Sequence, residues 1–569
     1  MDEVIKTPAT NSLNSDFIKH LRLASNHFGG DSAQMKIELL KKAAHFNISN
    51  IKFHVQYHDC LLFLLAYAEN KKLFDLANAE LLRVAAITRQ YSERKNERLQ
   101  IQLTGTGMAF TQVNVAFSFD MAKWLANSFP HDVSIMECDA GSEVIKDLIR
   151  ISFPKAEAEF LIKKIVSLED LFKEAKGESR LTDLQWLLKL ISEKNLTDEI
   201  RDHLYDSLKI YVQWHLNESM PSRTFARSLP RKIFYQEREI NRHPDAAKSI
   251  LKPITRPVEI SSIEKNSLVE TARGILCTLQ RETDPVTYAD VNAVQFFSMD
   301  RGVDIALYPM IVERRLPFDS YIGYIAFKNR LPVAYGGGWI FQQRSKIGVH
   351  VFEPYRGGES AFIFCQILRL YHNHYGVNRF VVEPYQIGKN NAEGIKSGAF
   401  WFYYRLGFLP VKEELRMLAA TEYERILEDK GYRSSLKEMK KLILSNLELV
   451  CDETGHHHTD VSFVSEAVTK MINSRFQGDR MNAETTIFRE IQKFLRMDNI
   501  SSFSRWEQRS MKNFSLLLST FTNLPQWNET DRRKMVELIR MKGGGSEWNY
   551  IRQFQKHRAL NEALSNLKP

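Results

Sequence analysis

Two short Glu-Pro-Tyr motifs hold the residue types in this sequence that are best suited to chemistry. Glu353 and Glu383 begin them, and each follows an apolar run typical of a buried strand, GVHVF at 348–352 and RFVV at 379–382. Because proline cannot donate a ladder hydrogen bond, both strands are expected to stop pairing at equivalent points. A carboxylate placed there can serve as a general base, directly or through water, and His350 is a third candidate. The alternative for each is a strand-end side chain bonded to backbone.

A glycine-rich turn follows the first motif. Residues 356–361 read RGGESA and are expected to open a helix that runs to about residue 376. A helix start presents N–H groups without partners and the positive end of a dipole, which suits a phosphate. Gly357 and Gly358 permit a close backbone approach, and Ser360 can cap the helix or donate a hydrogen bond. The alternative is a turn whose glycines serve geometry only.

A short aromatic helix is expected at 397–408, SGAFWFYYRLGF, closed by Leu-Gly-Phe. A phenol such as Tyr403, with an ordinary pKa of about 10, is a weaker acid than a thiol, with a pKa of about 8.5. It can still protonate a departing thiolate when its position and hydrogen bonding compensate for this difference. Tyr404 is the adjacent second candidate. The alternative for all five consecutive aromatic residues is the packing of a core helix.

The order strand, Arg-Gly turn, helix, strand, aromatic helix, Gly-Phe resembles the cofactor-binding core of the GNAT superfamily, the Gcn5-related N-acyltransferases. The resemblance covers only the region at about 259–412. In this family a loop of pattern Gln/Arg-x-x-Gly-x-Gly/Ala holds the pyrophosphate of an acyl-CoA, and Arg356 and Ala361 match its ends. The last family motif is matched by Ala399, Tyr403, Leu406, Gly407 and Phe408.

The resemblance implies an N-acyltransferase in which an amine attacks a thioester carbonyl directly. Two parallel strands would splay apart around the pantetheine arm of the donor, and a backbone N–H near Val351 or Phe352 would stabilise the oxyanion. Tyr403 would be the acid, and Glu353, Glu383 or His350 the base. The implied donor-binding residues are Val351, Phe352, Arg356, Gly357, Gly358, Ser360, Ala361 and Asn391.

Glu359 departs from the family pattern because it stands where the loop has its inner glycine. A carboxylate there would repel a pyrophosphate unless it points away from the ligand. Three outcomes remain open: an acyl-CoA donor, a smaller anion such as the single phosphate of a carrier-protein pantetheine, or lost donor binding. The alternative function is therefore a non-catalytic module of the same fold that binds protein or nucleic acid.

The remaining elements predict an α+β fold between large helical regions, and the resemblance implies a GNAT-like mixed sheet with splayed parallel strands. Lys328-Asn329-Arg330 predicts a hairpin turn, and the glycines at 336–338 predict a close backbone approach. The expected regions are a mainly helical one at 1–217 with a strand-like segment near 101–119 and helices over about 142–217, a linker or extended wrap at 218–258, a GNAT-like domain at 259–412 and a helical region at 413–569.

Composition narrows the class of protein without naming a function. The chain has 569 residues, 44% of them hydrophobic, and a net charge of +9, which predicts a mildly basic solvated surface and makes nucleic acid an unexpected partner. Five scattered cysteines without a CxxC motif favour a reduced, cytoplasmic protein. The longest apolar run, LLFLLAYA at 61–68, is too short to span a membrane, and no signal peptide is expected. The partners that the resemblance implies are an amine-bearing acceptor, small molecule or protein, and an acyl-carrier protein if the donor is not an acyl-CoA.

Other patterns carry less chemistry. Gly105 and Gly107 lack the rest of a nucleotide-binding fingerprint and predict a plain turn. Three consecutive histidines at 456–458 cannot all face one ion from a regular element, so no metal site is expected there. A GxSxG nucleophile motif is absent from the sequence.

Overall fold

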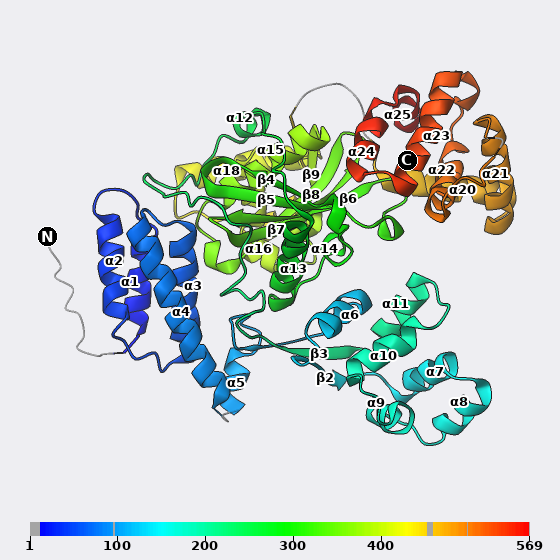
Figure 1. Cartoon of the computed structure of the whole chain (residues 1–569). Helices are drawn as coiled ribbons and strands as arrows, with labels where there is room; N and C mark the ends of the chain where they lie inside the picture. The colour runs from blue at the N-terminus through cyan, green and yellow to red at the C-terminus, as the bar shows by residue number, and fades with distance from the viewer. Residues whose placement is uncertain (1–11, 95–96, 452–458, 498, 568–569) are drawn as a thin grey trace. The chain divides into compact units, whose positions relative to one another are not determined.

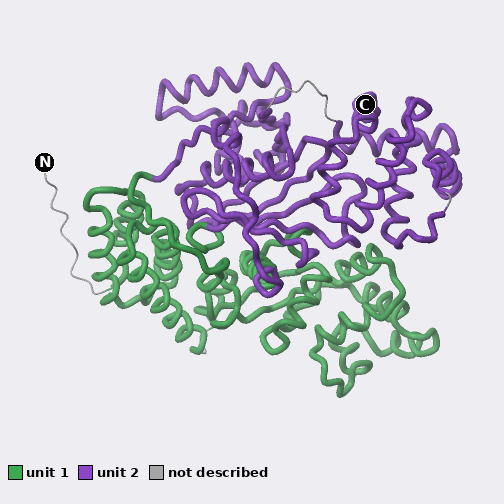
Figure 2. Tube along the Cα trace, turned by 45° about the horizontal axis from the view of Figure 1, so that its top comes forward, with its two compact units in different colours: residues 1–239, 266–287, 328–332 green, residues 240–265, 288–327, 333–569 purple. Residues whose placement is uncertain are grey.

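The computed structural model of the chain describes residues 12–94, 97–451, 459–497 and 499–567 (Figure 1). The protein is of mixed α and β class, as the sequence predicts. It divides into two compact units, unit 1 with residues 1–239, 266–287 and 328–332, and unit 2 with residues 240–265, 288–327 and 333–569 (Figure 2). Neither unit is continuous in the sequence, and the first crossing between them, after Glu239, falls inside the expected linker at 218–258.

Unit 1 begins with helices that pack through apolar faces. Asn14, Asn50 and Asn70 cap three of them by accepting backbone N–H groups of the first turn. The apolar run at 61–68 is buried in one of these helices and its end. The helices are α1 (Ser15–Ser25), α2 (Ser32–Ala43), α3 (Ile51–Ala66), α4 (Lys71–Glu93) and α5 (Glu97–Leu103).

A small antiparallel sheet follows in unit 1, in the order β1 (Gln112–Val115), β3 (Ile210–His215), β2 (Val133–Cys138). The expectation of helix up to residue 217 is wrong at β3, where buried and exposed residues alternate with the period of a strand. The strand-like segment near 101–119 contains strand only at β1, because α5 covers its start. Further helices of this unit are α6 (Phe119–Ser128), α7 (Ser142–Ser152), α8 (Lys155–Ile162), α9 (Leu168–Leu171), α10 (Asp183–Ser192), α11 (Asp198–Ser207), most of α13 (Ser262–Thr278) and α14 (Asp284–Thr287).

Unit 2 is built on a mixed sheet of eight strands, in the order β10-β11-β9-β8-β7-β6-β5-β4 (Figure 1). Its third strand from one edge, β9, is parallel to β8, whereas β11 pairs antiparallel with both β9 and β10. Because β11 lies beyond residue 412, the domain expected at 259–412 is too short to contain the whole sheet. The strands are β4 (Gln295–Ser298), β5 (Val303–Tyr308), β6 (Ser320–Lys328), β7 (Leu331–Phe341), β8 (Arg344–Val351), β9 (Arg379–Val382), β10 (Leu409–Pro410) and β11 (Leu447–Val450).

Helix α15 (Ser360–Tyr375) covers one face of this sheet. Its Tyr371 donates a hydrogen bond of 2.6 Å to the carbonyl of Ile322, and the ring lies 2.5 Å from where a Cβ on Gly338 would stand. A side chain at position 338 would therefore collide with the helix, which explains the close approach that the sequence predicts. Other helices of this unit are α12 (Ala246–Leu251), α16 (Ala392–Lys396), α17 (Ala399–Arg405), α18 (Glu413–Glu428) and α19 (Leu436–Leu442).

The last helices pack against the sheet through a buried ionic cluster. The Lys542 ammonium lies 3.1 Å from Glu547, and Arg315 lies 3.2 Å from the same carboxylate. All three side chains are nearly inaccessible, so each charge depends on the others for compensation. These helices are α20 (Val461–Phe476), α21 (Arg480–Phe494), α22 (Arg505–Leu518), α23 (Glu529–Gly544), α24 (Glu547–Lys556) and α25 (Arg558–Ser565).

The predicted turn between β6 and β7 is confirmed at Asn329 and Arg330, whose φ angles are +48° and +72°. Two successive positive φ angles are the signature of a two-residue hairpin turn. Among the described residues, we find no helix with both the length and the apolar character needed to cross a membrane.

Candidate functional site: a pocket between two diverging strands

Strands β8 and β9 pair over three positions only, and the pairing ends at Lys346 and Val381. Beyond these residues β8 continues to Val351 along β7, and a cavity of about 290 Å³ opens beside it. We call this cavity the splay pocket. Of the residues proposed from the sequence, its lining contains His350, Val351, Arg356, Gly357, Ser360, Asn391 and Tyr403.

Alternate backbone N–H groups of β8 point into the gap. The N–H of Phe352 donates to the carbonyl of Val333 at 2.9 Å, so the even-numbered residues of β8 face β7 and the odd-numbered ones face the gap. Val349 N–H donates to the Tyr403 hydroxyl oxygen at 3.3 Å. By the same alternation, Val351 N–H faces this gap. Of the two oxyanion donors considered, Val351 is thus the one whose N–H is directed toward the splay pocket.

Tyr403 reaches the gap from α17, where the ring packs against Phe364 and Phe408. The side chain is 2% exposed, and burial raises the pKa of its hydroxyl to about 12 while the Val349 N–H opposes the rise. The phenol is therefore protonated at neutral pH. Its oxygen is held by a backbone donor, so its proton is available to a group inside the pocket.

The three proposed bases lie in different surroundings. His350 lines the splay pocket, and its ring centroid lies 5.1 Å from that of Tyr335 and 6.5 Å from that of Phe352. Glu353 is exposed at the start of a 3₁₀ turn, Glu353–Tyr355, and does not line the pocket. Glu383 pairs with Lys346 at 2.9 Å and lines a different cavity. The structure therefore brings His350, but neither glutamate, to the pocket wall beside Tyr403.

The Arg-Gly turn forms one rim of the splay pocket. Gly357 has a φ of +87°, a conformation that a residue with a side chain rarely adopts. Helix α15 begins at Ser360 without a side-chain cap, so the N–H groups of its first turn have no partner within the helix. Ala361 belongs to that turn, whereas the N–H of Gly358 is used by the carbonyl of Tyr355 at 3.1 Å. The rim can thus present N–H donors to an anion.

Glu359 points away from this rim. Its carboxylate accepts hydrogen bonds of 2.9 Å from Arg301 Nε and from the backbone N–H of Asn241, and its side chain is 0% exposed. The negative charge that the sequence places in the phosphate position is therefore neutralised on the far side of the loop. Because the carboxylate points away from the rim, it is not expected to repel a phosphate bound there.

The pocket is also lined by seven residues that were not proposed as site residues from the sequence. Glu393 lies 3.2 Å from Arg356 Nη2, and Arg356 Nε also donates to the Val351 carbonyl at 3.2 Å. The Gln386 side chain occupies the space where a Cβ on Gly348 would stand, 2.8 Å away. Asn391 caps α16 by accepting the Gly394 N–H at 3.2 Å. Of these residues, only Gln386 had a signal in the sequence, because it directly follows the second Glu-Pro-Tyr motif. The further lining residues are Val349, Gln386, Glu393, Gly394, Ser397, Ala399 and Phe402.

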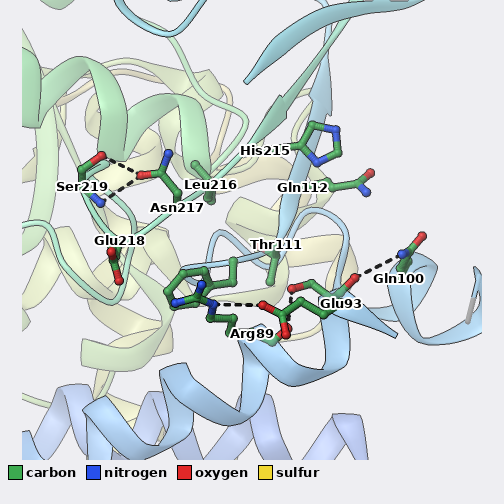
Figure 3. A pocket seen from close by; sticks show the side chains of 12 residues that line it. Arg89, Glu93, Gln100, Thr111, Gln112, His215, Leu216, Asn217, Glu218 and Ser219 are labelled. Atoms are coloured by element: carbon green, nitrogen blue, oxygen red, sulfur yellow. Dashed lines mark hydrogen bonds and ion pairs between the residues drawn. The ribbon is translucent and has the colours of Figure 1, made fainter. Parts of the chain in front are cut away.

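A larger cavity of about 620 Å³ lies in unit 1, between the end of α4 and the residues after β3 (Figure 3). Two pairs of its polar side chains are bonded to each other: Arg89 Nε donates to Glu93 at 3.0 Å, and the Ser219 hydroxyl donates to Asn217 at 2.7 Å (Figure 3). Burial lowers the pKa of His215, whose imidazole lines the same cavity. Among the residues drawn, no general acid lies next to a general base, so this cavity is a weaker candidate for a catalytic site than the splay pocket.

Metal chemistry has no candidate in the described part of the chain, where no three His, Cys, Asp or Glu side chains gather in a way that could hold an ion. The histidines at 456–458 lie outside the described residues. Comparison with known proteins adds no relative: no family model, no curated protein and no solved structure matches this chain.

Proposed function

We propose that unit 2 is an acyltransferase that moves an acyl group from a pantetheine thioester to an amine. One observation carries the proposal: β8 and β9 are parallel, separate after Lys346 and Val381, and hold Tyr403 in the gap between them. The GNAT resemblance implies this arrangement for a thioester donor. The pocket volume of about 290 Å³ lies at the lower end for small-molecule sites, roughly 300–1,000 Å³. It suits the pantetheine arm better than a whole nucleotide.

Each step of the reaction has a residue in the pocket. The arm lies between the strands, with its phosphate at the start of α15. Val351 N–H donates to the carbonyl oxygen as it becomes an oxyanion. His350 takes a proton from the attacking amine, and Tyr403 returns one to the departing thiolate. No covalent enzyme intermediate forms.

The donor is an acyl-CoA or an acyl-carrier protein, and the pocket size favours the part that both share. A titration of the purified protein with acetyl-CoA, long-chain acyl-CoA and acyl-carrier protein, followed by calorimetry and thermal shift, tests the proposal. Binding of at least one donor is expected, and binding of none would refute it.

The variant Tyr403→Phe tests the assigned acid. Loss of the hydroxyl should lower kcat by roughly 100-fold or more, since positioned acids contribute about 10²–10⁴. Donor affinity should stay nearly unchanged, because the ring and its packing remain. Phe402, an adjacent pocket residue without a hydroxyl, supplies the control as Phe402→Leu. Full activity of Tyr403→Phe would remove the role of this residue.

A non-catalytic binding module is the second candidate. It is favoured by the contact between Arg356 and Glu393, because the cation expected to meet the donor phosphate already has a carboxylate partner. Both side chains are about half exposed, so the pair is weak and a phosphate can replace Glu393. The donor titration separates the two candidates.

A further inference from the structure

A second cavity of unit 2, which we call the Trp339 pocket, has a volume of about 390 Å³. Position 338 faces Tyr371 of α15, so Trp339, the next residue of β7, faces the opposite side of the sheet. Trp339 lies five positions along β7 from Ala334, the partner of Val351, a span of about 17 Å at the rise of a strand. The Trp339 pocket and the splay pocket share no lining residue, so they are separate cavities.

The pocket has a flat aromatic wall that is fixed before any ligand arrives. Trp339 stacks on Tyr321, with ring centroids 3.8 Å apart and planes inclined by 12°. The Tyr321 ring in turn lies on Gly337, at 2.5 Å from where a Cβ would stand. An aromatic face of this kind binds flat apolar groups and cations. Phe318 and Phe341 extend the apolar surface.

The two cations of the pocket already have partners. Lys346 lies 2.9 Å from Glu383 and 3.3 Å from Asp460, and Arg344 lies 2.9 Å from Asp460. These pairs leave little positive charge for an anionic ligand. They also explain why Glu383, proposed above as a base, is occupied elsewhere.

Asp319 differs from these side chains. It lines the pocket, it is 9% exposed, and within the described residues no cation lies within ion-pair distance of its carboxylate. Burial raises the pKa of this carboxyl, and the charges of Lys542 and Lys346 oppose the rise without forming an ion pair with it. A buried carboxylate without a close counter-ion gains from a cation that enters beside it.

The loop that carries Asp319 is held rigidly from behind. Lys542 Nζ donates to the Asp319 carbonyl at 2.8 Å, and the Tyr550 hydroxyl donates to the Phe318 carbonyl. The Phe318 ring packs edge-on against Phe514 of α22 at 5.3 Å. Carboxylate and aromatic wall are thus pre-organised, which lowers the entropic cost of binding.

We propose that the Trp339 pocket is a ligand site for a primary ammonium group carried on a flat apolar body, with Asp319 binding the cation and Trp339 the body. The site goes beyond the proposed acyl transfer and does not depend on it.

Ligand-observed NMR and calorimetry on the full chain at pH 7 test this site with two probes of nearly equal shape. The first, 2-phenylethylamine, carries a positive charge, and the second, 2-phenylethanol, is neutral. The amine should bind about tenfold more tightly or better, because a hydrogen bond between charged groups adds to the shared apolar contact. Equal affinities of the two probes, or no binding of the amine at millimolar concentration, would overturn the proposal.

Variants locate the binding and keep the test independent of the proposed function. Asp319→Asn should abolish the preference for the amine, and Trp339→Ala should weaken both probes, with folding checked by thermal melting. Ser465→Ala, which changes another lining residue, should leave the affinities unchanged. Tyr403→Phe, in the splay pocket, should also leave them unchanged, so failure here is distinct from failure of the acyltransferase. Unaltered discrimination in Asp319→Asn would refute the assigned carboxylate; should that variant not fold, the wild-type discrimination and Trp339→Ala decide.

Discussion

Glu359→Gly places at position 359 the glycine of the GNAT loop that this sequence resembles, and its expected effects differ between the sequence pattern and the structure. From the pattern alone, Glu359→Gly should relieve repulsion in the phosphate loop and improve donor binding. In the structure the carboxylate is buried, faces Arg301 and Asn241, and does not line the splay pocket. The substitution should therefore leave donor affinity unchanged within about twofold and should destabilise unit 2.

The size of that destabilisation follows from the partners left behind. Breaking one side of a buried ion pair costs about 3–5 kcal/mol when the remaining charge stays buried. The Arg301 side chain is 26% exposed, so water can solvate part of its unpaired charge. We therefore expect a cost at the low end of this range, about 3 kcal/mol. The Asn241 N–H, which loses its acceptor, is included in this value.

Thermal unfolding and donor calorimetry on the same preparations give the readout. At about 2–4 °C per kcal/mol for a large domain, Glu359→Gly should lower the melting temperature of unit 2 by roughly 6–12 °C. Glu359→Gln keeps an acceptor for the Asn241 N–H, so its melting temperature should fall clearly less than that of Glu359→Gly. Tighter donor binding by Glu359→Gly with unchanged stability would refute the placement of this carboxylate.

Three further changes test other contacts. Glu393→Gln should strengthen binding of a phosphate-bearing donor by about two- to fivefold in calorimetry, since it releases Arg356 from a half-exposed pair; weaker binding would contradict this. Burial lowers the pKa of His374 to about 4, so the folded protein holds this imidazole neutral. The stability that depends on the neutral imidazole is fully present above the unfolded pKa of about 6.5 and is lost as the pH falls toward 4. The wild-type protein should therefore lose about 3 kcal/mol of unfolding free energy over this pH range. Denaturation curves of His374→Gln should not show this loss, and the same pH dependence in the variant would contradict the assignment to His374. Gly337→Ala should cost about 1–3 kcal/mol in denaturant unfolding because its methyl group meets the Tyr321 ring, and neutral stability would show that the ring is free to move.

Local patterns in the sequence predicted the elements around the splay pocket well. The hairpin turn at Asn329 and Arg330 could be predicted from adjacent residues, and so could the strand-turn-helix order around Gly357. The same locality explains the error at β3, where a helical pattern was extended over a short strand whose partners lie about 75 to 100 residues earlier in the chain.

Long-range pairing explains what the sequence could not supply. Glu359 is neutralised by Arg301, 58 residues away, and no local signal marks that partnership. Glu383 looked like a base because it ends a strand, yet Lys346 on the neighbouring strand binds it. The side chain of Gln386 reaches the pocket only because Gly348 leaves room for it.

Photo-crosslinking with a pantetheine 4′-phosphate thioester that carries a diazirine in its acyl chain tests the central claim most directly. The account predicts that mass spectrometry finds the crosslink on residues of the splay pocket, at Val349 to Val351, Gln386 or Phe402, and that unlabelled donor competes it away. Crosslinks that fall elsewhere on the chain, or none that a donor displaces, would contradict the assignment of the gap between β8 and β9 as the thioester site.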